Sequence, residues 1–166
     1  MTILREVKNM EVKRKMDFLC RQPAFAGLSF MEMREIEHML LPVAFTAGDE
    51  LFVQGQKADK TYFILEGSVQ VCRDVDNSVL GFSEMFKRAR IGFLGPFDFV
   101  GEVGCMTVRD GVYEITAVAW TPVTAYTMHK FDLLNYLVRA RQQFMLYSIL
   151  TCMVRRPTWR MRPLSR

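Results

Sequence analysis

The segment from Ile91 to Trp120 holds the residues of this chain whose types and spacing suit ligand chemistry. Its sequence, IGFLGPFDFVGEVGCMTVRDGVYEITAVAW, joins a Gly-Pro turn, a Gly-Glu pair, a short apolar stretch, a polar turn and a β-branched strand. A loop of this kind can point backbone N–H groups at an anion, and it offers one carboxylate, Glu102, as an acceptor. The pattern suits a sugar-phosphate ligand, but it lacks the arginine that such a site normally directs at a phosphate.

Two helical patterns precede this segment. Over residues 3–22, apolar residues recur every three to four positions with charges between them, which predicts a helix that Pro23 ends. Ser29 suits the N-cap of a second helix over 29–40, with Glu32 at the capping-box position. The methionine-rich stripe of this second helix is interpreted as core packing.

A different pattern begins at Val43. Short runs rich in Phe, Val, Ile, Tyr and Thr are separated by Gly and Asp, which is typical of an all-β barrel or sandwich. Gly67 suits a hairpin because glycine takes a positive φ at little cost. The clearest strand patterns lie at 51–53, 62–65, 68–72, 90–94, 113–120 and 123–128. Residues 74–88 are interpreted as a long hairpin connection or an insertion between strands.

Helical periodicity returns after His129 and extends from Phe131 to about Val154, as one helix or as two with a bend. The order of elements is therefore two helices, about eight strands and a final helix. This order predicts an α+β fold in which the terminal helices pack against a β-barrel.

Composition limits the class of protein. The 166 residues fit one domain, and half of them are hydrophobic, which is enough for a core. No apolar run reaches the roughly 18 residues that a membrane span needs, and the charged N-terminus does not resemble a secretory signal. The four cysteines are widely spaced without a CxxC pair, and the two histidines lie far apart. We therefore expect no disulfide framework, no metal site, and a reducing, cytoplasmic location.

The net charge of +4 is unevenly distributed. Basic residues cluster at 13–15, at 87–90 and in the tail 155–166, and the first two clusters are interpreted as solvated surface. The tail is basic enough to contact an acidic partner, a membrane surface or nucleic acid.

Three stretches together resemble the cyclic nucleotide-binding domain family, which includes regulatory subunits of cyclic-nucleotide-dependent kinases, gated channels and bacterial catabolite activators. FLCRQPAFAGLSFMEMREIEHML is similar to the family's first helices, AGDELFVQGQKADKTYFILEGSVQV to its first hairpins, and LGPFDFVGEVG to the start of its phosphate cassette. The resemblance covers about Phe18 to Val154. It implies an eight-stranded antiparallel jelly-roll-like β-barrel flanked by N-terminal helices and a C-terminal helix.

This resemblance divides the chain into an N-terminal helical segment 1–28, a cyclic nucleotide-binding-type domain with its lid helix 29–154, and a basic tail 155–166. It implies cAMP or cGMP as the ligand, with no further cofactor. Glu102, next to Gly101, would accept hydrogen bonds from the ribose 2′-hydroxyl. The residues that would offer backbone N–H groups to the phosphate are Val103, Gly104 and Cys105.

The family's arginine precedes by six residues the alanine that closes its next strand. If Ala119 is that alanine, Tyr113 stands at the arginine position, and a tyrosine cannot pair with a phosphate as a charged fork. Arg109, in the preceding turn, could supply the missing charge. Thr116 takes the place of the family's residue near the base. Glu114 is expected to point away from the face that carries Tyr113, because side chains alternate along a strand.

Two further departures from the family's pattern concern the shape of the expected pocket. Phe97 stands where the cassette has a glycine, and Val100 stands where it has an aromatic residue. Both predict a reshaped pocket floor.

Two functions follow. The first is a regulatory cyclic nucleotide sensor, in which ligand binding moves the flanking helices. The second is a degenerate, non-binding domain of the same fold that serves as a scaffold or interaction module in a larger assembly, such as a kinase or a channel. Enzyme activity is not expected, because the chain carries no Ser/His/Asp grouping, Walker loop or HExxH helix. DNA binding is not expected, because too few residues follow the lid helix for a helix-turn-helix.

Overall fold

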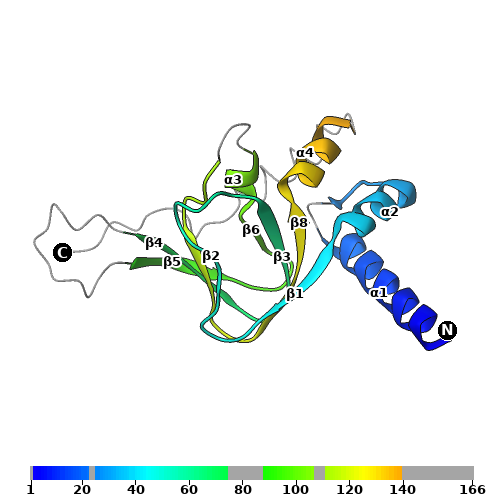
Figure 1. The fold of residues 1–166 in the computed structure, drawn as a ribbon, viewed down its shortest axis with the longest axis horizontal. Helices are drawn as coiled ribbons and strands as arrows, with labels where there is room; N and C mark the ends of the chain where they lie inside the picture. The colour runs from blue at the N-terminus through cyan, green and yellow to red at the C-terminus, as the bar shows by residue number, and fades with distance from the viewer. Residues whose placement is uncertain (1, 23–24, 75–87, 107–110, 140–166) are drawn as a thin grey trace, which may run out of the picture.

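The computed structural model describes residues 2–22, 25–74, 88–106 and 111–139. The helices are α1 (Thr2–Arg21), α2 (Phe30–Met39), α3 (Glu102–Met106) and α4 (Lys130–Arg139). The strands are β1 (Leu41–Phe45), β2 (Glu50–Phe52), β3 (Lys60–Glu66), β4 (Val69–Asp74), β5 (Arg88–Leu94), β6 (Phe99–Val100), β7 (Thr116–Ala119) and β8 (Val123–His129). Figure 1 shows α1 and α2 beside β1 and β8, with α3 and α4 at one end of the sheets.

The eight strands form two antiparallel sheets of four, in the orders β1-β8-β3-β6 and β2-β7-β4-β5. The prediction of eight antiparallel strands is confirmed for the described residues, but the prediction of a closed barrel is wrong. Strands β1 and β6 are the edges of one sheet, and β2 and β5 are the edges of the other. No ladder joins these edges within the described part of the chain, so the two sheets face each other as a sandwich.

The helical predictions are confirmed where the structure describes them. The helix expected over 3–22 is α1, and the helix expected after Ser29 is α2. A complete capping box starts α2: the Ser29 hydroxyl accepts from the amide of Glu32, and the Glu32 carboxylate accepts from the amide of Ser29 at 2.7 Å. The final helix begins at Lys130 as α4, while residues 140–154 of that prediction and the tail 155–166 lie outside the described residues.

A buried carboxylate joins the two N-terminal helices. Glu37 on α2 is 2% exposed, and its side chain forms ion pairs with Lys15 of α1 at 3.5 Å and with Arg34 of its own helix at 3.4 Å. The Lys15 ammonium also donates to the backbone carbonyl of Glu37 at 3.3 Å. A buried carboxylate needs such partners, so these contacts fix the pairing of α1 with α2.

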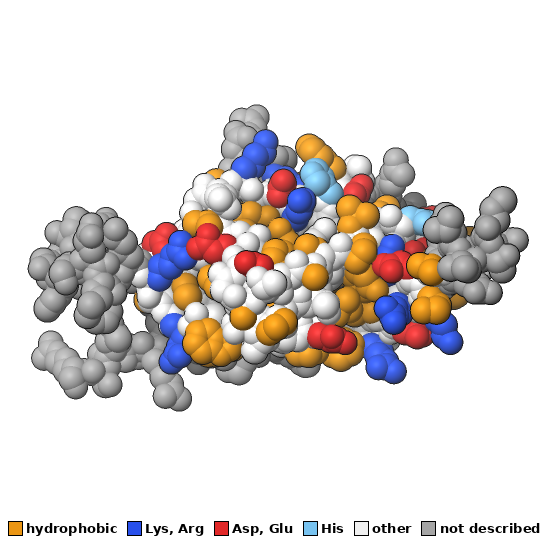
Figure 2. Space-filling model, turned by 60° about the horizontal axis from the view of Figure 1, so that its bottom comes forward, with side chains coloured by type: hydrophobic (Ala, Val, Ile, Leu, Met, Phe, Trp, Pro, Cys, Tyr) orange, Lys and Arg blue, Asp and Glu red, His pale blue; other side chains and the backbone are white. Residues whose placement is uncertain are grey.

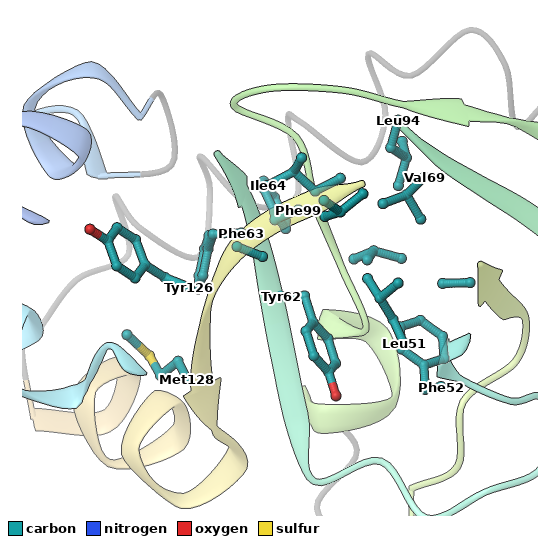
Figure 3. Packing of buried hydrophobic residues seen from close by; sticks show 14 of the residues in the cluster. Leu51, Phe52, Tyr62, Phe63, Ile64, Val69, Leu94, Phe99, Tyr126 and Met128 are labelled. Carbon is teal, nitrogen blue, oxygen red and sulfur yellow. The ribbon is translucent and has the colours of Figure 1, made fainter. Parts of the chain in front are cut away.

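Strand β3 explains why both faces of its sheet are buried. Figure 3 shows Tyr62 on the side of β3 that carries Phe52, and Phe63 on the other side with Tyr126. The Tyr62 ring lies 5.9 Å from Phe52 of the second sheet, whereas the Phe63 ring lies 6.2 Å from Phe18 of α1. Alternate side chains therefore pack against the partner sheet and against α1, which accounts for the burial of four consecutive residues, 61–64, in this strand.

The surface of the described residues is chemically mixed. Figure 2 shows hydrophobic, acidic and basic side chains interspersed on one face, without a single basic patch on that face. Within the described ranges, no helix has both the length and the apolarity to cross a bilayer.

Candidate functional site

A pocket of about 280 Å³ lies where α3 meets the segment that leads into β7. Four of its lining residues form one continuous turn from Gly101 to Gly104, and three come from the segment Tyr113–Ile115. Its remaining lining residues are Phe52, Arg73 and Val100. Both halves of the segment from Ile91 to Trp120 that the sequence singled out therefore line one cavity.

Two glycines allow the backbone to turn closely at the start of α3. Gly101 has a φ of +94°, and a Cβ there would lie 2.8 Å from the carbonyl oxygen of Lys60. A Cβ on Gly104 would lie 2.5 Å from that of Ala58 and 2.6 Å from the carbonyl oxygen of Val112. Any larger residue would push α3 away from these neighbours, so both glycines are required by packing.

Glu102 is the first residue of α3 and is 3% exposed. The neighbouring Val103 is exposed, and both residues line the pocket. A carboxylate in this position can accept hydrogen bonds from hydroxyl groups of a ligand, which is the chemistry expected of Glu102.

Tyr113 fills the position expected for an arginine, and its hydroxyl is already bonded to the backbone. The hydroxyl oxygen accepts from the amide of Lys60 at 3.1 Å and donates to the carbonyl of the same residue at 2.9 Å. Its ring stacks on Phe52 with centroids 3.9 Å apart. Burial raises the pKa of the Tyr113 phenol above its ordinary value, so the side chain is neutral at physiological pH. Tyr113 is therefore a packed structural residue with no charge to offer a phosphate.

Two of the predicted contact residues do not reach the pocket. The amide of Cys105 donates to the carbonyl of Gly101 at 3.4 Å, and its side chain is fully buried. Thr116 is also fully buried, and its hydroxyl accepts from the amide of Gln54 at 3.0 Å. Neither residue lines the pocket, so a phosphate contact from Cys105 and a base contact from Thr116 stay predictions without support from the pocket's geometry. Arg109 lies outside the described residues.

Glu114 corrects another expectation. Strand β7 begins only at Thr116, and Glu114 and Ile115 form a bend before it. Side chains alternate regularly only along a strand, so the expected opposition of Glu114 and Tyr113 does not apply. Glu114 lines the same pocket as Tyr113, which places a second acidic residue at the site.

Arg73 is the residue that the sequence reasoning missed. It lies on β4, whose register with β7 is continuous from Val69 to Cys72. Val69 and Val71 are buried on the inner face, and Arg73 follows with the same spacing of two. This alternation in the sequence could have identified Arg73, which is exposed and lines the pocket. Thr116 pairs with Cys72, off that face, which explains why it misses the pocket.

Phe97 also differs from its expected role. It does not line this pocket, so the prediction that it reshapes the pocket floor is wrong, whereas Val100 does line the pocket. Phe97 has a φ of +68°, and every other described residue with a positive φ is a glycine. Its ring stacks on Phe18 of α1 with centroids 6.3 Å apart. The position that favours glycine is therefore used to attach α1 to the sheet.

The described part of the site combines apolar walls with charged side chains of both signs. Its walls include Phe52, Val100 and Ile115, and the charged residues among its described lining are Arg73, Glu102 and Glu114. Such a pocket can enclose a ring system and bind hydroxyl groups. It lacks the bidentate cation that recognises phosphate in the position where the sequence pattern places one.

The two facing sheets, the glycine-rich turn into α3 and the flanking helices define a ligand-binding regulatory fold. The family described as cyclic nucleotide-binding domain matches residues 42–140. This chain belongs to that family.

Two regulatory subunits of protein kinases are among its relatives. A cAMP-dependent protein kinase regulatory subunit from Dictyostelium discoideum is 26% identical over 122 residues, which are 72% of this chain and 36% of the relative. The cAMP-dependent protein kinase type I-alpha regulatory subunit from Mesocricetus auratus is 31% identical over 85 residues, 51% of this chain and 47% of the relative. The matched regions thus cover less than half of each of these relatives.

A solved structure has the same fold. The regulatory subunit of a cAMP-independent protein kinase A from Trypanosoma cruzi, bound to guanosine, superposes with a TM-score of 0.73 at 17% identity. The match covers 91% of this chain and 48% of that one.

Proposed function

We propose that this chain is a regulatory sensing domain that binds a ligand of the cyclic nucleotide type and couples its binding to movement of the flanking helices. The observation that carries the proposal is the pocket itself. The Gly101–Gly104 turn and the Tyr113–Ile115 segment, the two halves of the family's ligand cassette, form one cavity of about 280 Å³. Its phosphate end is atypical, because Tyr113 replaces the arginine.

The route from pocket to helices begins at α3. This helix lines the pocket and contacts α4, which follows β8 without a break. Figure 1 shows the two helices next to each other at one end of the sandwich. The Leu133 side chain of α4 is buried, so α4 is held by packed side chains. A shift of α3 would therefore displace α4 through this packing.

The proposed domain spans 29–154, and the match of the family to 42–140 lies inside it. The relatives named above support a kinase-type regulatory assembly as the context in which the domain acts.

The alternative function is a degenerate scaffold domain that binds no nucleotide. The specific observation in its favour is Tyr113, whose hydroxyl is bonded to Lys60 and whose ring stacks on Phe52. A site that has lost its cation and filled the space with a packed ring is what loss of ligand binding would leave.

Calorimetric titration of the purified chain with cAMP and cGMP, up to millimolar ligand, separates the two functions. We expect measurable heat and a thermal shift, together with slower hydrogen exchange in α3 and α4 when ligand is bound. Glu102→Gln should weaken binding because a ribose acceptor loses its charge. Glu66→Gln is the matched control: Glu66 is an exposed carboxylate on β3 that does not line the pocket. Absence of heat and thermal shift with both ligands would overturn the sensor function and leave the scaffold function as the alternative.

A further inference from the structure

A groove of about 720 Å³ lies between α1 and the outer face of the sheet β1-β8-β3-β6. One wall is α1, and the other is formed by β1, β8, the end of β3 and Phe97. The groove and the pocket beside α3 have no described lining residue in common. It is therefore a separate surface, which the proposed function does not use.

The α1 wall of the groove carries charges that alternate in sign along the helix. The charged residues of α1 that line the groove follow one another at intervals of three or four positions: Glu11, Arg14, Asp17 and Arg21. Residues at this spacing lie on one face of a helix. None of them forms an ion pair with another described residue, whereas Lys15 between them pairs with Glu37. The groove thus presents an ordered row of charges to whatever occupies it.

The opposite wall of the groove and the free end of α1 are apolar. Ala44 is exposed at the groove, and Phe97 is 42% exposed there. Figure 1 shows the N-terminal turns of α1 extending beyond the sheets. On these turns Val7 and Met10 are 57% and 56% exposed. They precede Arg14 by seven and four positions, so they lie on the same face of α1 as the row of charges.

We propose that this groove is a dimer interface and that its occupant is the α1 helix of a second copy of the chain, lying antiparallel to the first. In this arrangement a two-fold axis passes near Met16 of each helix. Glu11 then faces the partner's Arg21, and Arg14 faces the partner's Asp17. The symmetry repeats both contacts, so a second copy supplies an opposite charge at every position of the row.

The same charges disfavour a parallel arrangement of the two helices. A parallel copy in register would set each charged residue against its own counterpart, so like charges would meet along the whole row. A parallel copy displaced by three residues would bring opposite charges together. That contact uses different surfaces on the two copies, so it continues into open chains instead of closing as a dimer.

The apolar side chains fit the antiparallel arrangement. The N-terminal turns of one α1 lie beside the C-terminal turns of the other, where Phe18 and Phe97 line the groove and stack on each other. Val7 and Met10 of each copy would then leave water against the partner's apolar wall. From Val7 to the end of the charged row the contact runs along roughly 21 Å of each helix. An interface of this length predicts a weak, reversible dimer.

Sedimentation velocity on the full chain, from micromolar to millimolar concentration, measures the association. We expect a reversible increase from one copy to two, which weakens at high salt because salt screens the charge pairs. Arg14→Asp sets like charges against each other twice in each dimer and should weaken association about tenfold or more. Lys13→Asp is the matched control: it makes the same change of charge at the neighbouring exposed residue, which does not line the groove. Its dissociation constant should stay within about twofold of the unsubstituted chain.

A pair of variants tests the antiparallel register itself. Asp17→Arg should also weaken self-association, because Arg14 of the partner then meets a second cation. When the Arg14→Asp chain and the Asp17→Arg chain are mixed in equal amounts, they should form a heterodimer, because both contacts between them join opposite charges. A defect in folding cannot produce this rescue. The chain that carries both substitutions should form a homodimer again, because its reversed row is also self-complementary.

A single copy at every concentration would overturn the inference. A dimer that Arg14→Asp leaves intact would also overturn it, because the two copies would then meet through another surface. If the unsubstituted chain forms a dimer but the mixed variants do not associate, the antiparallel pairing of α1 is wrong. None of these results decides whether a ligand binds beside α3, so the proposed function stands or falls separately.

Discussion

The hydroxyl of Tyr113 satisfies both backbone polar groups of Lys60, accepting from its amide at 3.1 Å and donating to its carbonyl at 2.9 Å. This pair of bonds joins the segment before β7 to the first residue of β3. Tyr113, which stands where an arginine is expected, thus links the two sheets. A charged side chain at the same position would have to break that link to reach a ligand.

Tyr113→Phe should therefore destabilise the fold without changing the pocket. The variant leaves the Lys60 amide and carbonyl without their partner, which costs about 1–2 kcal/mol of unfolding free energy. Urea unfolding measures this loss, with Tyr126→Phe as the control, because the packing of the Tyr126 ring on Phe18 at 5.4 Å does not involve the hydroxyl. Ligand affinity should change by less than about twofold. A collapse of ligand binding would show that the hydroxyl contacts the ligand.

Tyr113→Arg should restore binding of cyclic nucleotides. A guanidinium can pair with the phosphate through two charged hydrogen bonds, worth about 1.5–3 kcal/mol, or roughly ten- to a hundredfold in affinity. Calorimetry with cAMP and cGMP measures the gain, and Tyr113→Lys is the matched control, since it adds charge without the planar fork. We expect a lower melting temperature as well, because the stack on Phe52 is lost. No gain in affinity would mean that phosphate is excluded by another part of the pocket.

Local signals in the sequence were sufficient for the features that depend on a few neighbouring residues. The capping box of Ser29 and Glu32 is fixed by contacts within that stretch, and the positive φ of Gly101 is a property of its own backbone. Such patterns are legible because the physical cause lies within the pattern itself.

The sequence is least informative where a partner distant in sequence decides the outcome. Thr116 bonds to Gln54, 62 residues away, and Glu114 lies in a bend whose end is set by the pairing of β7. Closure of the barrel was overestimated for the same reason, because it depends on whether edge strands find each other. The strand predicted over 68–72 ends one residue before Arg73, whereas β4 extends to Asp74, and the spacing of Arg73 from Val71 places it on the inner face.

The backbone and the side chain of Phe97 should have opposite effects on stability: the positive φ is strained, whereas the ring stack on Phe18 is stabilising. At a φ of +68°, glycine avoids a cost of about 1 kcal/mol, whereas alanine retains it. Both substitutions lose the stack on Phe18, so Phe97→Gly should be about 1 kcal/mol more stable than Phe97→Ala. Urea unfolding compares the two variants. Ligand affinity should be the same in both, because Phe97 does not line the pocket. Equal stability of the two variants would contradict the backbone argument.

Cys105 should contribute to the pH dependence of stability in alkaline solution. Burial raises the pKa of its thiol from 9.0 to about 11, so the unfolded chain loses this proton before the folded one. Ionisation therefore favours the unfolded state. The contribution of this thiol to the free energy of unfolding is present below about pH 9 and is lost as the pH rises toward 11. The loss is of the order of 2–3 kcal/mol.

Cys105→Ala tests this pH-dependent contribution, because the variant removes the titrating thiol. Urea unfolding between pH 8 and about pH 11 should give a shallower decline for this variant than for the unsubstituted protein, whatever its stability at neutral pH. Cys20→Ala is the control, because its thiol is exposed on α1, and its decline should match the unsubstituted protein. Burial also raises the pKa of the Tyr113 phenol. This phenol is present in the unsubstituted protein and in both variants, so its contribution to the pH dependence cancels when they are compared. If the free energy of unfolding declined with pH equally in Cys105→Ala and Cys20→Ala, ionisation of the buried thiol would not destabilise the folded state.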